Sequence, residues 1–127
     1  MRFKAVIFDL DGTLLNTLED LAHSMNSVLQ RFGFPSHPLH AYRYFVGDGM
    51  ETLVRRTLPS DRSEEETTVA TCLAAMRQEY GLRWKELTEP YPGIPQLLDV
   101  LTERRMPKAV LSNKPDNFTR QMVDALL

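Results

Sequence analysis

The 127-residue sequence predicts an α/β fold, in which short parallel strands end in polar residues and helices connect them. A short apolar run, Ala5 to Phe8, leads into the carboxylates of Asp9 and Asp11. A second apolar run, residues 108–111, also leads into polar residues, and residues 17–84 between them have helical spacing. Open α/β sheets bind ligands at the carboxyl ends of their strands, so we expect the functional site at the carboxyl ends of the two predicted strands.

The first strand is expected to be buried on both faces, because its apolar run is continuous. Asp9 and Asp11 are two residues apart and would share a face of that strand, and Gly12 allows a sharp turn and close approach of a ligand. Two carboxylates this close repel each other unless a cation lies between them or one is protonated. Mg²⁺, bound by oxygen ligands and a substrate phosphate, suits this arrangement.

The pentapeptide Asp9-Leu10-Asp11-Gly12-Thr13 resembles the first motif of the haloacid dehalogenase superfamily, which consists mostly of phosphohydrolases. The resemblance implies two roles for Asp9: it is the nucleophile that forms an aspartyl-phosphate, and it is a ligand of Mg²⁺. It implies that Asp11 is the general acid/base and offers its backbone carbonyl to the metal as a second ligand, and that Gly12 and Thr13 bind phosphate or substrate. A strand ending in an Asp-Gly turn would explain Asp11-Gly12 alone, but not the whole pentapeptide.

A helix is predicted from Leu18 to Phe32, where apolar residues recur every three or four positions. Thr17 or Asn16 can cap it, and Glu19 and Asp20 suit the positive end of its dipole. A turn and a short helix over residues 39–45 follow. His37 and His40 have no obvious third ligand nearby, so a zinc site is not expected there.

The stretch Val46 to Glu51 allows two interpretations. Asp48 and Glu51 have the spacing of a capping box. Gly47 and Gly49 on either side of Asp48 also resemble the cap-domain loop of phosphoglycolate-phosphatase-like members, which closes over the active site and contacts the substrate. Both interpretations remain open, because capping does not exclude ligand contact.

Two more helices complete the central region. The first is expected from Met50 to Leu58, and the second opens at a Ser63–Glu66 capping box. Residues 17–84 are therefore predicted to form a helical cap domain, and residues 1–16 with 85–127 a partial core.

The chain returns to the core through residues 89–95, which hold three prolines and a glycine and fit a hinge. A helix to about Arg105 follows, with Leu97, Leu98 and Leu101 facing inward. After the second strand, the resemblance implies that Ser112 holds phosphoryl oxygens with help from Asn113. A final helix begins at Asp116, with an apolar face of Phe118, Met122 and Leu126.

The resemblance also implies parts that do not follow in these residues: further parallel strands, a later lysine and a further acidic motif. Lys114 is a candidate substitute for that lysine. We expect an incomplete Rossmann-like core of two parallel strands with an inserted helical cap. Its exposed sheet would need a missing C-terminal half or self-association to be completed.

Composition argues against several partners. Fifteen basic and seventeen acidic residues give a net charge of −2, which favours neither nucleic acid nor an anionic membrane surface. The single cysteine, Cys72, lies in a helical apolar pattern and is expected to be a buried thiol, which suggests a cytoplasmic protein.

The function expected from these features is Mg²⁺-dependent hydrolysis of a small, phosphoglycolate-like phosphomonoester through an aspartyl-phosphate, impaired in a chain of this length. One alternative is a non-catalytic fragment that binds phosphate or a partner chain. Another is a pyrophosphatase or a sugar-phosphate mutase of the same superfamily.

Overall fold

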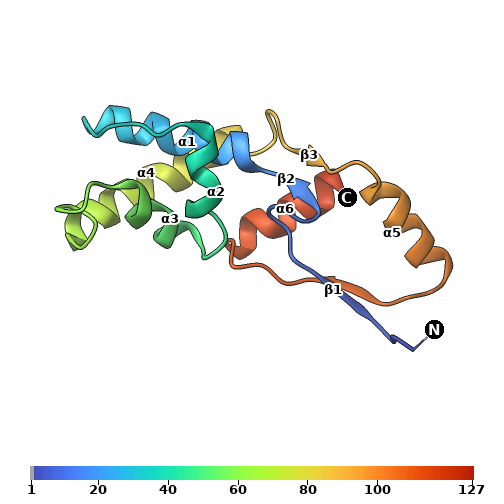
Figure 1. The fold of residues 1–127 in the computed structure, drawn as a ribbon. Coiled ribbons are helices and arrows are strands. Elements are labelled where there is room, and N and C mark those ends of the chain that lie inside the picture. The colour runs from blue at the N-terminus through green and yellow to red at the C-terminus, as the bar shows by residue number, and fades with distance from the viewer. Residues whose placement is uncertain (1) are drawn as a thin grey trace.

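The computed structural model describes residues 2–127, which form a helical lobe and a smaller α/β lobe (Figure 1). The helical lobe, called the insert below, contains α1, η1, α2, α3 and α4, and the α/β lobe contains the remaining elements. The elements in chain order are β1 (Val6–Phe8), β2 (Leu15–Asn16), α1 (Leu18–Arg31), η1 (Leu39–Ala41), α2 (Tyr42–Phe45), α3 (Met50–Thr57), α4 (Glu66–Arg83), β3 (Glu89–Pro90), α5 (Ile94–Glu103), β4 (Lys108–Val110) and α6 (Asp116–Leu126).

The two predicted strands are confirmed, and they pair in parallel. Val6 lies opposite Lys108 and Phe8 opposite Val110, so both strands end at the same level. The backbone N–H of Leu111 donates to the carbonyl of Phe8 at 2.8 Å and extends the pairing by one residue. This register brings the residues that follow β1 and β4 to one edge of the sheet, as the parallel arrangement requires.

The prediction that β1 is buried on both faces is wrong. Phe8 packs against the apolar core, but Ile7 is 69% exposed and Leu111 is 72% exposed. The core packs on the face of the sheet that carries Phe8 and Val110, so alternate side chains of the apolar run point into solvent. Leu97, expected to face inward, is also exposed on α5, whereas Leu101 of the same helix is buried as predicted.

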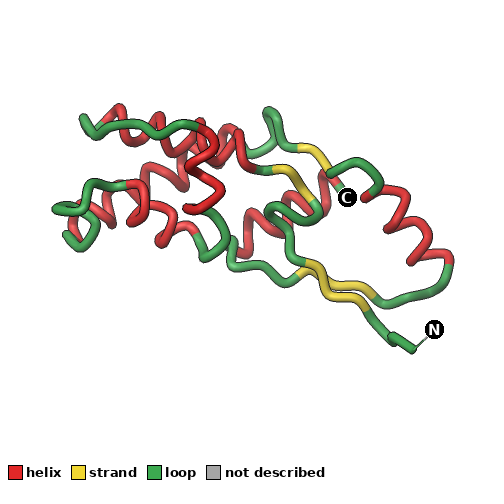
Figure 2. The backbone as a smooth tube through the Cα atoms, in the orientation of Figure 1, coloured by secondary structure: helices red, strands yellow, loops and turns green. Residues whose placement is uncertain are grey.

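The insert is built on the packing of α1 against α4, which run side by side in the helical lobe (Figure 2). Met25 and Leu29 of α1 and Met76 and Tyr80 of α4 are all fully buried. Cys72 is buried as predicted, and burial raises the pKa of its thiol. None of the helices in residues 2–127 has the length and apolar character needed to cross a membrane.

A second, antiparallel pairing joins the two places where the chain passes between the lobes. Leu15 of β2 lies opposite Pro90 of β3, and Asn16 opposite Glu89. The sequence did not predict these strands, because each is two residues long and one contains proline. Proline is tolerated here because the ribbon has only edge strands.

Asp20 anchors this ribbon to α1. Its side chain is 1% exposed and accepts hydrogen bonds from the N–H of Leu87 and from both the N–H and the hydroxyl of Thr88, at 2.7–3.1 Å. The prediction assigned Asp20 to the helix dipole alone. The structure gives it a further role, because three donors far along the chain converge on one buried carboxylate.

The predicted side-chain caps are wrong in all three places. Thr17 precedes α1 without capping it, because its hydroxyl bonds to Asp11 instead. Gly49, not Asp48, is the residue before α3, and Asp48 forms an ion pair with Arg56 at 2.6 Å. The residue before α4 makes no side-chain cap either, and Ser63 lies outside that helix.

Candidate functional site

A small cleft lies at the carboxyl ends of β1 and β4, between the α/β lobe and the insert. Asp9 and Asp11 reach it from the end of β1, and Ser112, Asn113 and Lys114 from the end of β4. The insert contributes the opposite wall, formed by Leu21, Val46, Gly47, Gly49, Met50 and Leu53. The cleft has a cavity volume of about 30 Å³, so the two lobes lie close together here.

A tight turn places the two carboxylates. The N–H groups of Thr13, Leu14 and Leu15 all donate to the carbonyl of Leu10, and the N–H of Gly12 donates to the carbonyl of Leu15. Gly12 has a φ of +77°, a conformation that a residue with a side chain adopts only with strain. The turn therefore explains why glycine follows Asp11.

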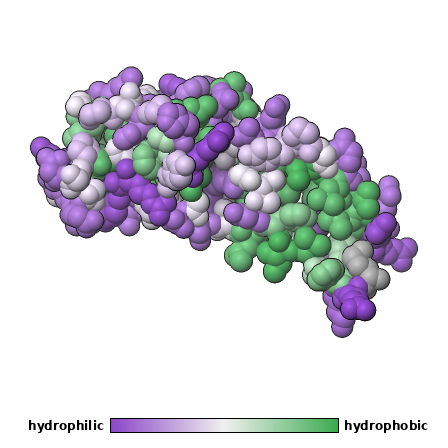
Figure 3. Space-filling view, viewed as in Figure 1, coloured by the Kyte–Doolittle hydropathy of each residue, from purple (hydrophilic) through white to green (hydrophobic). Residues whose placement is uncertain are grey.

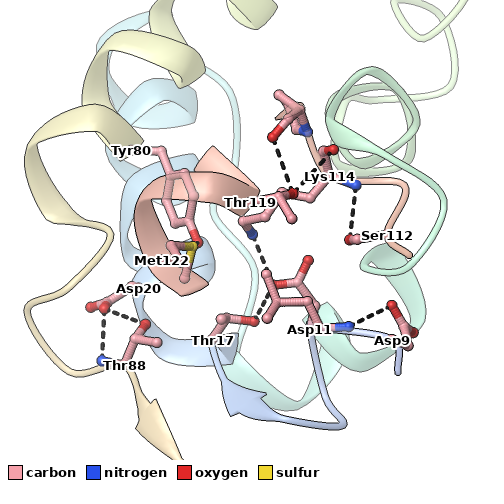
Figure 4. A network of polar contacts seen from close by, with 12 residues as sticks. Asp9, Asp11, Thr17, Asp20, Tyr80, Thr88, Ser112, Lys114, Thr119 and Met122 are labelled. Carbon is pink, nitrogen blue, oxygen red and sulfur yellow. Dashed lines mark hydrogen bonds and ion pairs between the residues drawn. The ribbon is translucent and has the colours of Figure 1, made fainter. Parts of the chain in front are cut away.

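Each aspartate has one oxygen held by a hydrogen bond. Oδ1 of Asp9 accepts from the N–H of Leu10 at 2.8 Å. Oδ1 of Asp11 accepts from the hydroxyl of Thr17 at 2.7 Å and from Nζ of Lys114 at 2.8 Å (Figure 4). Within residues 2–127 no hydrogen bond reaches Oδ2 of either aspartate. The carboxylates are thus oriented, and each keeps a free oxygen for a ligand or a proton.

Lys114 is the cation of the site. Its side chain is 3% exposed, and besides pairing with Asp11 it lies over the ring of Tyr80, with Nζ 4.6 Å from the centroid. Burial lowers the pKa of Lys114, and the neighbouring Asp11 opposes this effect. Burial also raises the pKa of the Tyr80 phenol, with smaller contributions from Asp11 and Asp20.

Ser112 and Asn113 lie at the end of β4 as expected, and their side chains contact protein groups. Oγ of Ser112 accepts from the N–H of Lys114 at 3.1 Å. The side-chain amide of Asn113 donates to the carbonyl of Gly47 at 2.9 Å, across the gap between the lobes. A Cβ at Gly49 would lie 3.3 Å from the carbonyl oxygen of Asn113, so the glycine permits this close approach.

The structure thus brings together six of the eight predicted site residues. Asp9, Asp11, Gly47, Gly49, Ser112 and Asn113 all line the cleft. Gly12 and Thr13 are exposed outside its lining, and their contact with phosphate stays a prediction.

Sequence reasoning missed Thr17 and Tyr80 as neighbours of the site. Thr17 was interpreted as a helix cap and Tyr80 as one of several apolar residues in a helix. Neither position carries a signal in the sequence that would identify its contact with the site.

The residues fit Mg²⁺ held by the Asp9 carboxylate and by the backbone of Asp11. Residues 2–127 contain no group of three or more His, Cys, Asp or Glu side chains that could enclose a metal ion. Mg²⁺ does not need such a cage, because it is commonly bound by one or two carboxylates, with water and substrate phosphate as the other ligands. The free oxygen of Asp9 and the backbone carbonyl of Asp11 are suitable for this role, and the free oxygen of the Asp11 carboxylate remains available for a proton.

Comparison with known proteins identifies a matching family and several similar phosphatases. The model of the haloacid dehalogenase-like hydrolase family matches residues 6–126. A phosphoglycolate phosphatase from Pseudomonas putida is 34% identical over 97% of this chain and 46% of its own length. One from Haemophilus influenzae is 33% identical over 98% of this chain and 58% of its own length. The chain therefore spans about half the length of the curated relatives that it matches.

Solved structures agree with the fold. The crystal structure of a predicted phosphoglycolate phosphatase from Haemophilus somnus 129pt has a TM-score of 0.88 at 27% identity and covers 99% of this chain and 58% of its own. A structure from Lactobacillus delbrueckii subsp. bulgaricus has a TM-score of 0.91 at 27% identity, and covers 100% of this chain and 62% of its own. On the family match, which spans nearly all of its residues, this chain belongs to the haloacid dehalogenase-like hydrolases.

Proposed function

We propose that this chain is part of a Mg²⁺-dependent phosphatase that acts on a small, phosphoglycolate-like phosphomonoester. It supplies the nucleophile, the general acid/base and the insert that closes over the bound substrate. One observation carries the proposal: Asp9, Asp11 and Ser112 line one cleft at the coincident ends of two parallel strands. The phosphoglycolate phosphatases among the relatives support the substrate class.

In the proposed reaction, the free oxygen of Asp9 attacks phosphorus and the bond from phosphorus to the leaving oxygen breaks. Asp11 gives its proton to the leaving oxygen. It then takes a proton from the water that attacks the aspartyl-phosphate, which releases phosphate and regenerates Asp9. Ser112 holds a phosphoryl oxygen. When bound, Mg²⁺ would neutralise charge on the phosphoryl oxygens beside the two carboxylates.

The hydrogen bonds of Asp11 are consistent with its double role. Thr17 and Lys114 both donate to Oδ1 and fix the carboxylate plane, so Oδ2 is the oxygen that can carry the proton. An oriented acid/base of this kind contributes about 10²–10⁴-fold to a rate.

The insert is proposed to act as a lid over this cleft. Gly47 and Gly49 form part of the wall that faces Ser112 and Asn113, and the cavity volume of about 30 Å³ is far below the roughly 300 Å³ or more of a typical ligand pocket. A phosphomonoester therefore enters only when the lobes separate. Closure then excludes bulk water from the aspartyl-phosphate.

We also propose that the exposed sheet is covered in the working protein by further chain or by a second copy. Figure 3 shows apolar surface gathered over the α/β lobe. Exposed apolar residues of this lobe include Phe3, Ile7 and Leu111. An uncovered apolar sheet edge favours association. We propose a cytoplasmic location, because Cys72 is a free thiol.

The test is release of phosphate from phosphoglycolate and from p-nitrophenyl phosphate, with and without Mg²⁺. It uses this chain and a version extended to the length of its relatives. We expect activity in the extended form, little or none in the short form, and loss of activity in Asp9→Asn. The exposed Asp99→Asn on α5 is the matched control and should retain activity.

Three outcomes would contradict the mechanism, the catalytic role or the substrate class. Full activity of extended Asp9→Asn would exclude the aspartyl-phosphate. Binding of phosphate without turnover in the extended form would favour a non-catalytic phosphate-binding protein. Preference for pyrophosphate, or isomerisation of a sugar phosphate, would move the substrate class to the alternatives named above.

A further inference from the structure

Lys114 joins parts of the chain that are far apart in sequence. Its ammonium pairs with Asp11, in the turn after β1, and lies over the ring of Tyr80, which is in the last part of α4 of the insert (Figure 4). Its own backbone belongs to the loop between β4 and α6. One buried side chain therefore contacts the acid group of the site and the insert at the same time.

The position of Tyr80 is fixed from other directions. Its ring meets that of Phe118 edge-to-face, with centroids 5.0 Å apart, and its hydroxyl lies 3.6 Å from the sulfur of Met122. Both partners are on α6, which begins two residues after Lys114. The insert therefore rests on α6 and on the Lys114 ammonium together.

The neighbour of Lys114 holds a second part of the insert. Asn113 donates to the carbonyl of Gly47, and Gly49 lies against the Asn113 backbone. Since α3 and α4 pack on each other, Asn113 and Lys114 contact the same body at two points. A shift in the position of the Asp11 carboxylate can therefore be transmitted to the insert through the contacts made by the loop after β4.

A buried ammonium needs both of its partners, because burial without compensation disfavours a charge. Among the residues that the structure describes, loss of Asp11 would leave the ammonium with only the Tyr80 ring, and loss of the ring would leave it only the carboxylate. We infer that Lys114 is a positioning residue that links the placement of the helical insert to the Asp11 carboxylate. The inference rests on the proposed function only in treating Asp11 as a reacting group.

Hydrogen exchange followed by mass spectrometry tests the link without an activity assay. In Lys114→Met, amides of Gly47 to Met50 should exchange about 30-fold faster, the change expected when a desolvated cation–π contact is lost. Amides inside the α1–α4 pair should be unchanged. Lys114→Arg, which keeps the charge, should restore most of the protection. Lys108→Met is the control, because Lys108 is exposed and, within the described residues 2–127, its ammonium bonds only to Thr102.

Coupling must also run in both directions. Asp11→Asn should speed exchange at Gly47 to Met50, and Tyr80→Leu should speed exchange in the turn from Gly12 to Leu15. Tyr80→Phe keeps the ring and should not affect that turn. These variants keep the test decisive if Lys114→Met does not fold.

Unchanged exchange at Gly47 to Met50 in both Lys114→Met and Asp11→Asn would overturn the inference. Faster exchange throughout the insert would also overturn it, because that result indicates general destabilisation. Exchange that changes as expected in a protein with no phosphatase activity would support the link and count against the proposed function alone.

Discussion

Replacing Asp20 with alanine should destabilise the protein far more than its place in the first turn of a helix suggests. Asp20 is buried and accepts hydrogen bonds from the N–H and hydroxyl of Thr88, which is itself 6% exposed. A buried donor left without a partner costs about 1–2 kcal/mol when its surroundings relax in part, so the two donors give about 2–4 kcal/mol. That is a large part of a stability of about 5–15 kcal/mol, which is typical of a domain.

Glu19→Ala is the matched control for Asp20→Ala. Glu19 is the adjacent acidic residue in the same first turn and interacts with the same helix dipole, but it is exposed. Its loss should cost less than about 1 kcal/mol. Urea unfolding of both variants, followed by circular dichroism, measures the difference. If the two free energies of unfolding agree to within about 1 kcal/mol, the buried hydrogen bonds do not stabilise the ribbon as argued.

Three further predictions use other features of the chain. Gly49→Ala should lower the free energy of unfolding by about 1–2 kcal/mol, because φ is +91° and a Cβ would crowd the opposite backbone, whereas Gly81→Ala in α4 should raise it by about 0.5 kcal/mol. Burial raises the pKa of Tyr42 above its ordinary value of 10.0, so the unfolded chain loses the phenol proton first as the pH rises. The free energy of unfolding should therefore fall as the pH rises past 10, and it should fall less steeply in Tyr42→Phe. Urea midpoints measured at pH 9 and above test this, and equal pH dependence in the two proteins would show that burial has no effect. Ile7→Asn should reduce self-association of the 127-residue chain, as measured by size-exclusion chromatography. Leu82, which is 77% exposed on the insert, is the control, and an equal reduction in Leu82→Asn would argue that the sheet face does not mediate self-association.

The elements were largely predictable because hydrophobic periodicity is a local signal. The residues of α1 recur at helical spacing, and β1 and β4 are short apolar runs followed by polar residues. Their parallel pairing followed from the helical region between them, since parallel strands need a long crossover. The burial of the strands could not be predicted in the same way. Ile7 is exposed because no part of residues 2–127 covers that face, a property of tertiary structure that an apolar run does not report.

The site was predictable where the residues form a motif and unpredictable where contacts come from distant elements. Asp9, Asp11 and Ser112 follow strands, and the strand register alone brings them to one edge. Thr17 could be recognised as a candidate cap, but its hydroxyl is used by Asp11. Tyr80 reaches Lys114 only because α4 folds back against α6, a packing arrangement that helical periodicity does not specify.

The β2–β3 ribbon has a consequence for how this kind of molecule can vary. Both passages of the chain between the lobes are adjacent strands, so the insert leaves and re-enters at nearly one point. An element with neighbouring ends can be lengthened, shortened or exchanged with little effect on the scaffold that hosts it. If the insert acts as the proposed lid, inserts of different shape grafted between Asn16 and Glu89 would admit different substrates, while the strand ends that hold Asp9 and Ser112 keep their geometry.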